Sequence, residues 1–88
     1  MLLERFTHKI KDYSYDPRND ILYIHFSRMT EDQYAEELDD GFYEIRSIDT
    51  DEVKGLMILY ARSQTDQQIQ NLEEYGYGDI DIRDMVIT

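Results

Sequence analysis

The chain has 88 residues, no cysteine and a net charge of −11, because 20 acidic side chains outnumber nine basic ones. This length predicts one small domain, residues 1–88, and the lack of cysteine excludes a disulfide framework and thiolate metal sites. The longest apolar runs fall far short of the ~20 residues of a membrane helix, and the start (MLLERFTHK) does not resemble a secretion signal. We therefore expect a soluble, cytoplasmic protein that repels nucleic acid and anionic membranes.

The first two predicted strands flank a turn. Residues 9–15 (KIKDYSY) alternate loosely and are rich in tyrosine, and residues 21–26 (ILYIHF) are mostly β-branched or aromatic. Between them, residues 16–20 (DPRND) supply turn chemistry, since the proline presets φ and the first aspartate can accept a backbone N–H. One face of the second strand is our expected core face, with Leu22, Ile24 and Phe26.

Three further strands are predicted, with short turns between them. Residues 33–38 (QYAEEL) are compatible with a helical turn or a polar edge strand, and the tight-turn signal at residues 39–41 (DDG) favours the strand. Residues 42–48 (FYEIRSI) and 53–60 (VKGLMILY) follow, with a turn at residues 50–52. These hairpins predict an antiparallel meander.

The chain then changes character. Thr65 and Gln68 are spaced as a capping box, and Gly76 is placed to end a short helix over residues 66–75. The predicted fold class is therefore α+β: an antiparallel β-meander of four to five strands with one short helix packed on the sheet.

The last segment, residues 79–87 (DIDIRDMVI), alternates in its first half. This pattern predicts either a final strand or a tail that becomes ordered on a partner. We expect the sheet of residues 9–60 to stay folded when residues 79–88 are deleted.

Part of the chain resembles a known family. Residues 15–26 (YDPRNDILYIHF), 36–41 (EELDDG) and 53–59 (VKGLMIL) follow the order seen in a small bacterial and phage family called domain of unknown function 2283. The resemblance covers residues 11–62 and implies an antiparallel sheet without assigned catalytic residues. Some members occur beside small RelE-like toxin genes, which implies an antitoxin-like role. Residues 63–88 lie outside the family pattern.

Acidic side chains are concentrated in residues 31–52, where ten carboxylates and one base, Arg46, give a net charge of −9. Acids on a sheet can be simple solubility devices, but such surfaces usually mix both signs, so the asymmetry favours a basic partner protein. The predicted partner-binding residues are Glu36, Glu37, Asp39, Asp40, Glu44, Asp49, Asp51 and Glu52.

No catalytic residue, metal site or cofactor is predicted. Residues 49–54 begin like a calcium loop but place valine and lysine where an EF-hand needs a ligand and a glycine. Residues 79–84 lack the glycine and the closing glutamate. His8 and His25 show no spacing to a serine and a carboxylate that indicates a nucleophilic site.

We therefore expect a non-enzymatic interaction module that binds and neutralises a basic partner protein, as an antitoxin or inhibitor does. One alternative is a nucleic-acid mimic, in which carboxylates of residues 31–52 and 66–84 occupy the groove of a nuclease or defence enzyme. The second alternative is a metal-binding or enzymatic domain. No direct contact with nucleic acid or membrane is expected, and a homodimer is compatible with the sequence.

Overall fold

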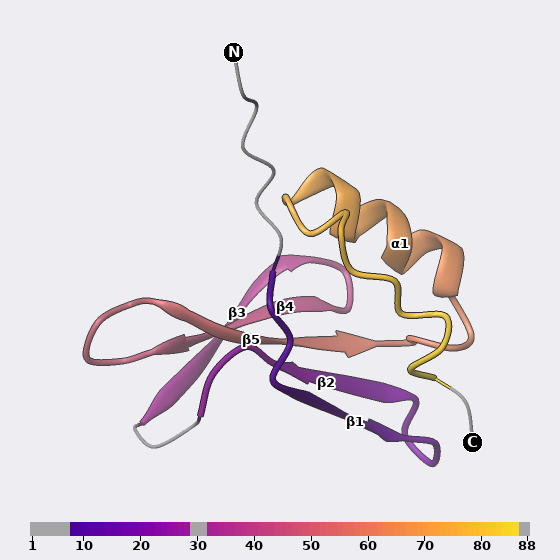
Figure 1. Cartoon of the computed structure of the whole chain (residues 1–88). Coiled ribbons are helices and arrows are strands. Elements are labelled where there is room, and N and C mark those ends of the chain that lie inside the picture. Colours follow the sequence, from indigo (N-terminus) through magenta and orange to yellow (C-terminus); the bar gives the residue numbers. More distant parts are fainter. Residues whose placement is uncertain (1–7, 29–31, 87–88) are drawn as a thin grey trace.

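The computed structural model describes residues 8–28 and 32–86. Five strands form one antiparallel sheet: β1 (Asp12–Asp16), β2 (Ile21–His25), β3 (Gln33–Asp39), β4 (Phe42–Ser47) and β5 (Val53–Leu59). The helix α1 (Thr65–Glu74) and the irregular segment after it lie on the same face of the sheet (Figure 1). The fold class is α+β, as predicted.

The strand order β1-β2-β5-β4-β3 differs from the predicted simple meander. The three hairpins are present, but after β2 the chain passes to the far edge of the sheet. β2 therefore pairs with β5 instead of β3, which is the strand order of a Greek key. Strand patterning could not reveal this, because β2 buries the same side chains beside either neighbour.

The core lies between the sheet and the layer formed by α1 and the last segment. Leu22 and Ile24 on β2 are fully buried, which confirms their predicted facing, and Phe26 packs against the core. β5 contributes Leu56 and Ile58 to the same face. The opposite layer contributes Leu72, Tyr77, Ile80, Ile82 and Val86.

The start of α1 differs from the predicted capping box. Gln64 occupies the N-cap without a side-chain hydrogen bond, and Thr65 is the first helical residue. The Thr65 hydroxyl donates to the carbonyl of Ala61 at 2.9 Å. Gln68 is buried instead of capping the helix, and its amide donates to the Leu59 carbonyl at 2.7 Å. Gln68 therefore bonds to the sheet instead of capping the helix, which is the role that the local sequence pattern predicted.

The end of α1 is the one that the sequence predicts. Gly76 has a φ of +90°, a left-handed conformation that glycine adopts without strain. The N–H of Tyr77 donates to the Leu72 carbonyl at 2.6 Å, and the N–H of Gly76 donates to the Glu73 carbonyl at 3.4 Å. These two bonds form a Schellman motif, which reverses the chain after the helix.

The last described segment, residues 79–86, is neither a strand nor a detached tail. Ile82 is fully buried, and Ile80 and Val86 are nearly so. Local backbone bonds shape the segment: the N–H of Ile80 donates to Tyr77, and the N–H of Met85 donates to Ile82, both at 3.0 Å. The alternating isoleucines thus enter the core without pairing in the sheet.

Candidate functional site

The β3–β4 hairpin presents several of the predicted partner-binding acids. Asp40 and Gly41 form its two-residue loop, and the Gly41 φ of +73° confirms the predicted turn. β3 is an edge strand, so Glu36 and Glu37 are exposed, and they lie on opposite faces because successive side chains alternate. Asp39, beside the loop, is half-buried.

Arg46, the only base among residues 31–52, is surrounded by three of these acids. Its Nη2 lies 2.7 Å from Glu44 Oε1, and its Nε lies 3.0 Å from Glu36 Oε2. Its Nη1 donates to the Asp51 carbonyl at 2.8 Å and lies 4.0 Å from the Asp51 carboxylate. The hydrogen bond with Glu44, followed by the charges of all three acids, raises the pKa of Arg46. The guanidinium therefore remains charged and engaged within the protein.

Glu44 has a position that the sequence did not indicate. Only 7% of its surface is exposed, so its carboxylate is not presented to a partner in this structure. Besides Arg46, it accepts a hydrogen bond from the hydroxyl of Tyr77, which lies 33 residues further along the chain. Burial, followed by the bond to Glu44, raises the pKa of Tyr77. The phenol therefore stays protonated and donates to the buried carboxylate.

The remaining acids lie outside the Arg46 cluster. Glu52 contacts Lys54, with Nζ and Oε2 3.1 Å apart. Glu37 accepts a hydrogen bond from the Tyr43 hydroxyl, and this bond is the largest of the effects that raise the pKa of Tyr43. Four of the remaining carboxylates are exposed: Glu37, Asp40, Asp49 and Glu52.

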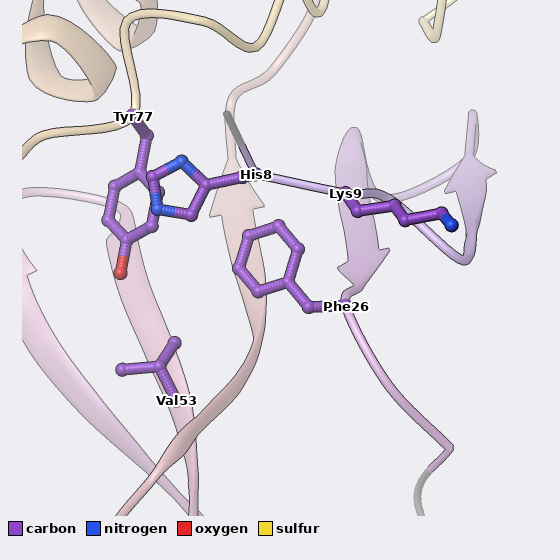
Figure 2. A pocket seen from close by; sticks show the side chains of 5 residues that line it. All are labelled: His8, Lys9, Phe26, Val53 and Tyr77. Carbon is purple, nitrogen blue, oxygen red and sulfur yellow. The ribbon is translucent and has the colours of Figure 1, made fainter. Parts of the chain in front are cut away.

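A pocket of about 360 Å³ lies near the start of the described chain (Figure 2). The His8 ring lies over Tyr77, with ring centroids 4.6 Å apart, and its Nδ1 is 2.8 Å from Oδ1 of Asp79. Burial alone would raise the pKa of Asp79, but hydrogen bonds from His8 outweigh it and hold the pKa below its ordinary value. The pocket is lined by His8, Lys9, Phe26, Val53 and Tyr77.

This pocket joins distant segments of the chain. The His8–Asp79 contact ties the beginning of the described chain to the last segment. None of the five lining residues is a serine, threonine or cysteine that His8 could activate as a nucleophile. Sequence spacing could not have indicated the pair, since its members are 71 residues apart.

The described residues contain neither a metal-binding cluster nor a membrane-spanning helix. Within residues 8–28 and 32–86, no group of three or more histidine, aspartate or glutamate side chains could hold a metal ion. The helix found in this part of the chain, α1, has ten residues, and it is neither long nor apolar enough to cross a membrane.

Comparison of the chain with protein-family models, curated proteins and solved structures found no match. The resemblance to domain of unknown function 2283 therefore gains no support from these comparisons.

Proposed function

We propose that the protein is a non-enzymatic acidic module that binds and neutralises a basic partner protein. One observation carries this proposal: Arg46 is already engaged by Glu36, Glu44 and Asp51, while neighbouring carboxylates face solvent. These exposed acids follow the β3 edge and the turns at both ends of β4.

Such a charge distribution mainly affects how fast the protein and a basic partner associate. Exposed carboxylates steer a basic partner toward the β3 side of the sheet and raise the association rate. Screening limits this attraction to about 8 Å at physiological salt. The proposed binding should therefore weaken as salt rises.

The two alternatives have less support. A nucleic-acid mimic needs acids arranged like phosphates along one surface, whereas Glu36 and Glu37 lie on opposite faces of the sheet and Glu44 is buried. An enzyme of the nucleophilic type needs a serine, threonine or cysteine beside its histidine, and none is among the five residues that line the pocket at His8.

The test compares two sets of charge reversals of equal size. The first variant carries Glu37→Lys, Asp40→Lys, Asp49→Lys and Glu52→Lys, all at exposed positions outside the Arg46 cluster. The matched control reverses four exposed acids of α1 and the last segment: Asp66, Glu73, Glu74 and Asp84. Both variants and the natural chain serve as bait in an extract of the native host, and quantitative mass spectrometry identifies the captured proteins.

We expect a basic protein that the natural chain and the control capture and that the first variant loses. The purified partner should then show an association rate that falls with salt for the natural chain. Equal capture by both variants, or captured proteins that are not basic, would contradict the proposed function.

A further inference from the structure

The sheet face opposite α1 is not covered by any element within residues 8–28 and 32–86 (Figure 1). Strand register places Tyr23, Met57 and Tyr43 side by side across β2, β5 and β4. Residues two positions away along a strand point to the same side. The resulting surface, called here the open face, is partly exposed and has at its centre Ile21, Tyr23, Tyr43, Ile45, Met57 and Leu59.

Both edge strands add carboxylates to the open face. On β3, Glu37 pairs in register with Tyr43. On β1, Asp12 pairs with His25, and the His25 Nδ1 lies 3.0 Å from Asp12 Oδ1. None of the residues paired in register across this face is a lysine or arginine, and Lys54, which lies at the β5 irregularity beside Gly55, contacts Glu52 at 3.1 Å. The open face is therefore an apolar strip between two acidic margins.

The dimensions of this strip match an α-helix. Neighbouring strands lie about 4.8 Å apart, so the three central strands span roughly 10 Å between their outer axes. An α-helix with its side chains is about 10–12 Å wide. A helix along β5 would thus cover the apolar strip, and long basic side chains on its flanks would reach the margins on β1 and β3.

Charge argues against a second copy of this chain as the occupant. Each copy carries a net charge of −11, and the open face offers no lysine or arginine among its paired residues. In a face-to-face dimer, the margins carrying Asp12 and Glu37 would meet margins of the same sign, which costs free energy. A basic helix would bring the opposite sign to the same places.

We infer that the open face docks a basic amphipathic helix of the partner, with an apolar stripe against Met57 and its neighbours and lysine or arginine along both flanks. The inference rests on the proposed function, since it assumes a basic partner, and adds where and how that partner binds. The uncovered apolar strip and its acidic margins supply the apolar contact and the charge that such a helix requires.

The test uses two synthetic peptides of about 18 residues, which as helices would span ~27 Å. One peptide places leucine at helical i, i+3, i+4 and i+7 spacing with lysine elsewhere, and the other scrambles the same composition. Met57→Glu puts a charge in the middle of the open face. Ile48→Glu makes the same charge change at a turn residue that is 58% exposed. Affinities are measured by fluorescence anisotropy at physiological salt, and circular dichroism checks that each variant folds.

We expect the amphipathic peptide to bind more tightly than the scrambled one. Met57→Glu should weaken its binding by at least about tenfold, while Ile48→Glu should not. Both substitutions add negative charge, so a loss confined to Met57→Glu reports apolar docking and not electrostatic attraction.

Other outcomes separate the inference from the proposed function. If Met57→Glu binds normally while the variant with four charge reversals, which include Glu37 and Asp40, does not bind, docking on the open face is rejected and the proposed electrostatic binding is retained. If neither change affects binding, both are rejected. Equal binding of the two peptides would overturn the helical docking. A natural-chain dimer that Met57→Glu dissociates, seen by analytical ultracentrifugation, would make a second copy the occupant.

Discussion

At the scale of single residues, Asp20 links two parts of the fold. Its backbone adopts a φ of +56° at the end of the β1–β2 turn. Its carboxylate accepts hydrogen bonds from the Tyr15 hydroxyl at 2.7 Å, the Arg62 N–H at 2.7 Å, and the Ser63 N–H and hydroxyl at 3.0 and 2.7 Å. The turn is thereby joined to the connection between β5 and α1.

These contacts make a pH-dependent contribution to stability. Burial alone would raise the pKa of Asp20, but hydrogen bonds from Ser63, Tyr15 and Arg62 outweigh it and hold the pKa below its ordinary value. The contribution is therefore complete above the unfolded-state pKa, about 3.9, and is lost as pH falls through the lower folded-state pKa. Asparagine also tolerates a positive φ, so Asp20→Asn removes the carboxylate without adding backbone strain.

We predict that Asp20→Asn lowers the free energy of unfolding by about 1–3 kcal/mol at neutral pH, because four hydrogen bonds lose their charged acceptor. The difference in the free energy of unfolding between the variant and the natural chain should shrink as pH falls below about 4. Urea denaturation at a series of pH values measures both effects. Asp84→Asn, at an exposed position, is the control and should behave like the natural chain. A difference that does not shrink in acid would rule out the hydrogen-bonded carboxylate as its cause.

At the scale of elements, the last segment is part of the core. Ile82 is fully buried, and Ile80 and Val86 pack into the same cluster. Removing one large buried aliphatic side chain typically costs about 2–5 kcal/mol, and a whole domain has only about 5–15 kcal/mol of stability. The last segment therefore supplies a large part of the free energy of unfolding.

We predict that a chain lacking residues 79–88 no longer unfolds cooperatively, contrary to the sequence-based expectation for the 9–60 sheet. Ile82→Ala alone should lower the free energy of unfolding by about 2–5 kcal/mol and keep a cooperative transition. Arg83→Ala, at an exposed position of the same segment, is the control. Thermal unfolding followed by circular dichroism measures all three. An unchanged midpoint in the truncated chain would show that the core does not depend on the segment.

At the scale of the whole molecule, charge of one sign opposes compaction. A net charge of −11 on 88 residues makes the folded chain repel itself more strongly than the expanded unfolded chain does. The Arg46 cluster and the Lys54–Glu52 contact compensate only locally. Added salt should relieve the repulsion, because the screening length falls from about 30 Å at 0.01 M to about 10 Å at 0.1 M.

We predict that the thermal midpoint rises as sodium chloride is increased from about 0.01 M to 0.5 M. Reversing Asp66, Glu73, Glu74 and Asp84 to lysine brings the net charge from −11 to −3 (four changes of +2) and should flatten this rise. Differential scanning calorimetry on both chains measures the effect. A midpoint that falls with salt would mean that local ion pairs, and not overall repulsion, dominate the electrostatics.

The sequence by itself determined the features that depend on neighbouring residues. The turn at Asp40 and Gly41, the helix end at Gly76 and the buried face with Leu22 and Ile24 all follow from local conformational preference and alternation. The excess of carboxylates along β3 and β4 was equally visible, since charge can be counted along the chain.

Only the tertiary structure decided which distant residues meet. The placement of β2 beside β5, the bond between Tyr77 and Glu44, and the bonds of Asp20 to Arg62 and Ser63 all join residues tens of positions apart. The same holds for the predicted acids: Arg46 neutralises some and Glu44 is buried, while others remain exposed. Local pattern cannot encode these choices, because burial and pairing depend on the arrangement of the whole sheet and the layer that covers it.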